Sequence, residues 1–146
     1  MGTRSFIAVK SSEGFKGVYC HWDGYLEHVG RILRQHYADA AKIAELIEHG
    51  DISSLDAEIG SKHDFDQRTE GQTTFYGRDR GENDCGPESR TTLQAIMNHA
   101  NRRGCEYFYL FQNGDWQYAE RGPQYFGQSD GSRFSDLKPL PQQIAA

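Results

Sequence analysis

The chain has 146 residues with 36% hydrophobic and 12% aromatic content, and it carries a formal net charge of −5. This length suits a single domain, and no apolar run approaches the ~20 residues that cross a bilayer. The acidic balance argues against direct nucleic-acid binding, which normally needs a basic patch. Since the first residues also lack the apolar stretch of a secretory signal, we expect a cytoplasmic protein without membrane contact.

Two short β-rich segments, residues 4–9 and 17–22, flank a turn over residues 11–14 and predict an N-terminal hairpin. Cys20 and His21 are neighbours on the second strand, so their side chains point to opposite faces. They therefore cannot form a catalytic thiolate–imidazolium pair with each other.

Two helices are expected next. The first begins at Asp23 or Gly24, with Asp23 as a suitable N-cap, and ends near Tyr37. The second begins at Asp39, and Gly50 follows it in a position that favours a left-handed backbone.

Residues 39–70 are strongly acidic, with nine acids against three bases. Such a segment either solvates one face of the molecule or attracts a basic partner. Within it, His63, Asp64 and Asp66 are metal-ligand types, but their spacing matches no established site, and we expect no metal and no cofactor.

The second half predicts a short strand over residues 73–76, a charged turn over 77–87 and a helix that follows Glu88 or Ser89 and ends near Arg102. Asn113-Gly114 then predicts a two-residue hairpin turn that sets Phe111 opposite Trp116. This hairpin is apolar on both faces, so other parts of the molecule must cover each of them.

Together these elements predict one α+β domain over residues 1–122, followed by an irregular C-terminal tail over 123–146. We expect an antiparallel sheet of about four strands, made of the N-terminal and C-terminal hairpins, with about three helices mainly on one face. The three cysteines, Cys20, Cys85 and Cys105, form no CxxC pair, so we expect reduced thiols, with Cys20 and Cys105 packed in the core.

Two dense polar and aromatic runs, residues 19–25 and 75–82, are the candidate binding surface. Arginine forks bind phosphate and aromatic rings stack on bases, so a nucleotide-type ligand fits this composition. The candidate ligand-binding residues are His21, Trp22, Asp23, Tyr76, Arg78, Asp79 and Arg80.

Structural roles are open for the same residues. Arg78–Asp79 or Arg80–Glu82 could be internal ion pairs, and Asp23 could serve only as a helix cap. Trp22 could seal the hairpin against the first helix.

The opening Gly2-Thr3-Arg4-Ser5, the run 19–25, the segment 50–55 and the run 75–82 together resemble a family of small bacteriophage and prophage proteins. The resemblance covers residues 2–120 and departs at Leu26, where that family commonly has proline. It implies a setting, the host-cell cytoplasm, but no activity.

From this we expect a non-enzymatic binding protein that antagonises a host defence, either by sequestering a nucleotide-type molecule or by blocking a host protein with the acidic segment. A small nucleotide or phosphodiester hydrolase using His21, Asp79 and Glu82 is the alternative, and a phage structural or assembly factor is a further one. Self-association is open.

Overall fold

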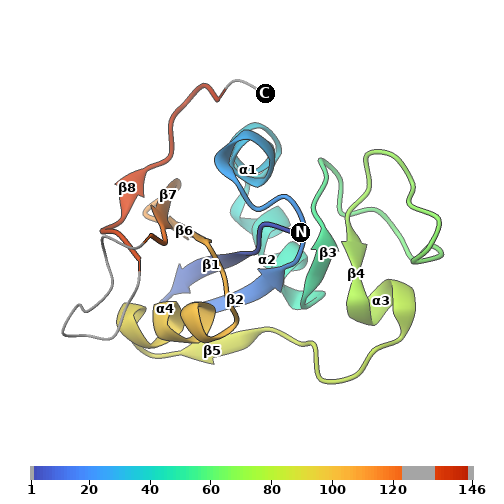
Figure 1. Ribbon diagram of the computed structural model, residues 1–146, viewed down its shortest axis with the longest axis horizontal. Coiled ribbons are helices and arrows are strands. Elements are labelled where there is room, and N and C mark those ends of the chain that lie inside the picture. Colours follow the sequence, from blue (N-terminus) through green and yellow to red (C-terminus); the bar gives the residue numbers. More distant parts are fainter. Residues whose placement is uncertain (1, 123–133, 145–146) are drawn as a thin grey trace.

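The computed structural model describes residues 2–122 and 134–144 (Figure 1). In these residues one sheet contains eight strands: β1 (Ser5–Ser11), β2 (Gly14–Cys20), β3 (Ile52–Ser54), β4 (Thr74–Phe75), β5 (Glu88–Arg90), β6 (Tyr107–Gln112), β7 (Asp115–Glu120) and β8 (Lys138–Pro139). The helical elements are a π-helical turn, η1 (Leu26–Gly30), and four α-helices: α1 (Arg31–His36), α2 (Ala40–Glu48), α3 (Tyr76–Arg80) and α4 (Leu93–Arg102).

The sheet is mixed, with the order β4-β3-β2-β1-β6-β7-β8 and with β5 also paired to β2. β1 is parallel to β6 and β2 is parallel to β3, whereas the other pairs are antiparallel. The α+β class is confirmed, but the predicted antiparallel sheet of about four strands is wrong. Parallel strands need a long crossover between them, and no local sequence pattern reports which distant strands will pair.

Apolar residues on alternate positions of the central strands supply two cores, one on each face of the sheet. One core joins Ile7, Val18 and Trp116 to buried residues of α1 and α2. The other joins Phe6, Ala8 and Phe108 to α4, and Figure 1 shows α1 and α4 on opposite sides of the sheet. The expectation of helices mainly on one face is therefore corrected, because α4 covers the second apolar face of the C-terminal hairpin.

Of the two aspartates expected at helix starts, only one caps its helix. The Asp39 carboxylate accepts from the Ala41 N–H at 3.1 Å and caps α2, which begins at Ala40, one residue after the predicted start. Asp23 is not an N-cap, because its backbone turns into the left-handed region (φ 57°) and Tyr25 precedes the first helical turn instead.

The third predicted helix also begins later than expected. Thr92 caps α4 by accepting from the Ala95 N–H at 3.1 Å, while residues 88–90 extend into β5.

The C-terminal hairpin has the predicted register, with Phe111 opposite Trp116 and positive φ at Asn113 and Gly114. Within the predicted tail, β8 pairs with β7 and Leu140 is buried, so residues 134–144 pack against the body. Residues 123–133 lie outside the described part. No helix in the described ranges is long and apolar enough to cross a membrane.

Candidate functional site

The sheet topology brings four separate segments to one end of the central strands. β1 and β6 both begin at this end, whereas β2 and β7 run the opposite way and finish there. Arg4 precedes β1, Glu106 precedes β6, His21 follows β2 and Arg121 follows β7. The Glu106 N–H donates to the Arg4 carbonyl and the Arg121 N–H donates to the Glu106 carbonyl, both at 2.8 Å.

A hollow of about 440 Å³ opens at this end of the sheet, and we call it the His21 hollow. Its polar and aromatic lining consists of Arg4, His21, Trp22, Glu106 and Arg121. Two glycines, at positions 2 and 104, complete the lining.

Trp22 is an exposed large hydrophobic side chain in the described part of the chain, with 36% of its surface accessible. A Cβ on Gly2 would lie 2.8 Å from the Trp22 ring, so glycine at this position allows the chain to pass close to the indole. The predicted alternative, in which Trp22 seals the hairpin against the first helix, does not account for this exposed surface of the ring.

The charges in the His21 hollow are not paired with one another. Among the described residues, neither the guanidinium of Arg4 nor that of Arg121 forms an ion pair or a hydrogen bond, and the Glu106 carboxylate has no such partner. Two cations against one anion leave the hollow positive in a protein that is negative overall. An unpaired guanidinium at a surface hollow is available for phosphate or carboxylate.

His21 is held by a buried network. The Tyr19 hydroxyl and the His21 Nδ1 are hydrogen bonded at 2.7 Å, and the Tyr19 ring lies 4.3 Å below the Arg103 guanidinium. Burial raises the pKa of Tyr19 to about 12, so this hydroxyl keeps its proton. Burial and then the Arg4 charge lower the pKa of His21, which favours a neutral imidazole at pH 7.

Tyr76 lies in a second, smaller hollow of about 260 Å³, next to the first. Tyr19 and Arg103 line it from one side, together with Asp51, whose carboxylate contacts Arg103 at 3.3 Å. The two sequence runs are thus close neighbours, since Cys20 pairs with Ile52 and Ile52 pairs with Phe75. They nevertheless line adjoining hollows and not a single recess.

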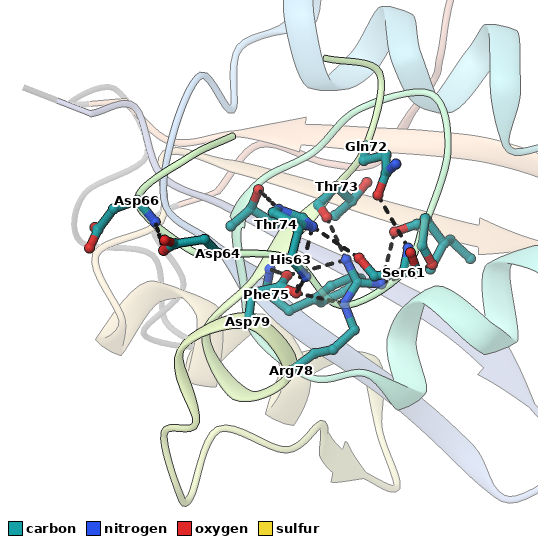
Figure 2. Close-up of polar contacts among 12 residues, drawn as sticks. Ser61, His63, Asp64, Asp66, Gln72, Thr73, Thr74, Phe75, Arg78 and Asp79 are labelled. Carbon is teal, nitrogen blue, oxygen red and sulfur yellow. Dashed lines mark hydrogen bonds and ion pairs between the residues drawn. The ribbon is translucent and has the colours of Figure 1, made fainter. Parts of the chain in front are cut away.

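The guanidinium donors of Arg78 are all engaged in contacts within the chain, and Figure 2 shows these contacts converging on the guanidinium. Nη1 donates to the carbonyls of Ile59 at 2.9 Å and Gly60 at 3.1 Å, and Nη2 donates to the Thr73 carbonyl at 2.8 Å. Nε donates to the Asp79 carboxylate at 3.0 Å. Arg78 therefore fastens the long 59–73 connection to α3 and presents no donor to a ligand.

Asp79 is equally enclosed. Its side chain is fully buried and accepts from the Phe75 N–H at 2.8 Å and the His63 N–H at 3.1 Å. Burial alone would raise the pKa of Asp79, but these bonds and the Arg78 fork outweigh it and lower the pKa. Figure 2 shows the same cluster, with Asp64 and Asp66 away from the His63 side chain. In the described ranges no group of three or more His, Cys, Asp or Glu residues is placed to hold a metal ion.

Arg80 and Asp23 are also engaged within the chain. Arg80 pairs with Glu82 and lies over the rings of Phe65 and Tyr76, at 4.5 and 5.1 Å from the ring centres. The Asp23 carboxylate accepts from the Tyr25 hydroxyl at 3.4 Å. Both alternatives stated from the sequence, an Arg78–Asp79 pair and an Arg80–Glu82 pair, are therefore present.

The two buried cysteines are not reactive thiols. Cys20 and Cys105 are buried and unpaired, as predicted, and burial raises the pKa of each to about 12.

The residues that complete the His21 hollow, Arg4, Glu106 and Arg121, are absent from the predicted site. Each lies just outside a strand in a stretch without a dense run, so no local signal singles it out. The C-terminal hairpin sets Glu106 beside Arg121, and the parallel pairing of β1 with β6 brings Arg4 to them.

The chain has no match among protein-family models, curated proteins or solved structures. The resemblance to bacteriophage proteins therefore stays a prediction.

Proposed function

We propose that this protein is a non-enzymatic binding protein that holds a nucleotide-type anion in the His21 hollow. The observation that supports it is the pair of unpaired guanidinium groups, on Arg4 and Arg121, beside the exposed indole of Trp22. Guanidinium groups bind phosphate, and an exposed aromatic face stacks on a base with little dependence on base identity.

Binding is favoured over the hydrolase alternative because the three groups that a hydrolase would use are not together. His21 lines the first hollow, Glu82 lines the second and is paired with Arg80, and Asp79 is buried against Arg78. General acid–base catalysis needs such groups within hydrogen-bond reach of one substrate.

Sequestration of a nucleotide signal is also better supported than blocking of a host protein by residues 39–70. Several acids of that segment are occupied: Asp51 is buried against Arg103, and Glu48 pairs with Lys16. Asp56 accepts from the N–H groups of Ala57 and Gly71. The bacteriophage setting suggests that the bound nucleotide belongs to a host defence, and this remains part of the proposal.

A calorimetric and melting screen tests the binding. AMP, ADP, ATP and cyclic AMP, with their guanine, cytosine and uracil counterparts, are added to the full chain. We expect at least one nucleotide to raise the Tm, because a ligand that binds only the folded state stabilises it, by about 2.7 kcal/mol at a hundred times its Kd. Mass spectrometry should recover the nucleotide unchanged.

Matched arginine variants locate the site. Arg4→Gln and Arg121→Gln should each weaken binding by roughly tenfold to a hundredfold, as expected for loss of a hydrogen bond to a charged group. Arg68→Gln removes the same charge from an exposed position outside the hollow and should leave the Kd unchanged. A screen without any Tm shift, or equal losses in all three variants, would overturn the proposal.

A further inference from the structure

The geometry points to a finer selectivity of the same site: Glu106 selects ribonucleotides over deoxyribonucleotides by accepting hydrogen bonds from the sugar hydroxyls. This inference rests on the proposed function and names the class of nucleotide that the His21 hollow takes.

The first step is the order of the groups across the sheet edge. β2, β1, β6 and β7 are consecutive neighbours in the sheet. Their ends therefore present, in a row, the aromatic pair His21 and Trp22, then Arg4, then Glu106, then Arg121. Neighbouring strands are spaced by about 4.8 Å, so the row has the extent of a nucleotide and not of a single phosphate.

Glu106 lies between the two arginines, and its backbone is held there. The backbone of Glu106 is tied on both sides, since its N–H donates to Arg4 and its carbonyl accepts from Arg121, each at 2.8 Å. Its side chain is exposed and forms no ion pair with either arginine. The acid is thus held between two cations without neutralising them.

The third step is the chemistry of an ionised carboxylate, which accepts hydrogen bonds and donates none. Next to a bound phosphate, a carboxylate alone is repulsive, so it favours a ligand only if that ligand offers donors at this point. With the base on Trp22 at one end of the row and the phosphate on Arg121 at the other end, the sugar lies between them, and its hydroxyls are the donors that face Glu106. Carboxylates recognise ribose hydroxyls in this way in dinucleotide-binding folds.

The test uses the full chain and calorimetry with ATP, GTP, CTP and UTP and the 2′-deoxy counterpart of each. The wild-type protein should bind the ribonucleotide at least about tenfold more tightly than its deoxy form, which is the effect of a hydrogen bond to a charged group. In Glu106→Gln this ratio should fall toward one. The same variant should bind the deoxynucleotide and inorganic phosphate several-fold more tightly, because a like charge has been removed.

A structural defect cannot imitate this result, because the variant is expected to gain affinity for one ligand while it loses discrimination. Glutamine has nearly the shape of glutamate, and position 106 is exposed, so the Tm should not change. Glu27→Gln removes an equal charge from an exposed position outside the hollow and should alter neither ratio nor affinity.

The possible failures are distinct. Equal binding of ribo and deoxy forms by the wild-type protein, or an unchanged ratio in Glu106→Gln, overturns the ribose inference. If Arg4→Gln still loses binding in that case, the nucleotide site itself stands. If no nucleotide binds the wild-type protein, both the proposed function and this inference are wrong.

Discussion

At the scale of single residues, Arg78 shows why a charged and aromatic run in a sequence does not identify a ligand site. Its guanidinium has the chemistry of a phosphate fork, yet its donors are directed to three backbone carbonyls and one carboxylate. The ring of Phe75, which begins the candidate binding run 75–82, lies 4.6 Å from the same guanidinium. An arginine whose partners come from a distant loop looks identical in the sequence to one that is free.

The first prediction concerns the stability supplied by this pair. Asp79→Asn leaves the Arg78 charge buried without its counter-ion, and removal of one partner of a buried pair costs about 3–5 kcal/mol. We expect a loss of that size in the free energy of unfolding, measured by urea denaturation at pH 7. Asp64→Asn, at an exposed turn of the same connection, should change it by less than about 0.5 kcal/mol.

The second prediction follows from the lowered pKa of Asp79. A carboxyl whose pKa is lower in the folded state than in the unfolded state stabilises the fold above the unfolded pKa. That contribution is lost as the pH falls through the folded pKa, below the ordinary value of 3.8. The free energy of unfolding should therefore decrease from pH 4 toward pH 2. Asp79→Asn should show a shallower decrease, although Glu88 and Asp115, whose pKa values are also lowered, keep part of it. An identical slope in both proteins would contradict the assignment.

The third prediction concerns Trp22. The chain has two tryptophans, and the other, Trp116, is buried with its indole N–H donating to the Tyr37 carbonyl at 2.8 Å. A base that stacks on Trp22 should quench the exposed component of the fluorescence. Trp22→Ala should weaken binding by about 1–3 kcal/mol, the value of one base stack. In Trp22→Phe, the remaining emission from Trp116 should not respond to nucleotide.

At the scale of secondary structure, prediction succeeded where the signal is local. Asn113-Gly114 fixes a two-residue turn, and the turn fixes the register of the whole hairpin. Asp39 and Gly50 bound α2 because capping depends on nearby residues.

The elements that sequence reasoning missed are too short for any periodic signal. β3, β5 and β8 contain two or three residues each, and α3 contains five. Such elements exist because tertiary contacts hold them, as Arg78 and Asp79 hold α3 to the 59–73 connection. Their positions could not be derived from propensity or pattern alone.

The fourth prediction compares two glycines with a similar backbone. Gly50 has φ +85° and Gly114 has φ +77°, so alanine is strained at both, by about 1–2 kcal/mol. A Cβ at position 50 would also lie 2.2 Å from the Cys85 carbonyl oxygen, whereas position 114 has nothing within 4 Å. Gly50→Ala should therefore lower the free energy of unfolding clearly more than Gly114→Ala, in urea denaturation of both. Equal losses would mean that Gly50 and Cys85 are not in this close contact.

At the scale of the whole molecule, the candidate site is a product of topology. Residues at positions 4, 21, 22, 106 and 121 form one hollow because parallel β1 and β6 begin at the same end of the sheet. Two of these five residues, His21 and Trp22, could be predicted because a dense run marks them. The other three could not, because Arg4 joins Glu106 and Arg121 only after the two hairpins have paired.

The overall charge sets the last prediction, because an anion must approach a protein of net charge −5. The His21 hollow offers it two guanidinium groups, and there burial and the Arg4 charge lower the pKa of His21. A bound anion stabilises the imidazolium, so the pKa of His21 rises on binding and a proton is taken up. Affinity should therefore increase as the pH falls from 7.5 to 5.5.

Cyclic AMP is a suitable probe, because its phosphodiester does not titrate in this range. His21→Gln should remove most of this pH dependence in calorimetry, whereas His36→Gln, exposed on α1, should keep it. At 0.15 M ionic strength, salt screens charges that are more than about 8 Å apart. Added salt should therefore weaken binding only by screening the short contacts between the anion and the charges of the hollow. A pH dependence that survives in His21→Gln would show that a group other than this imidazole takes up the proton.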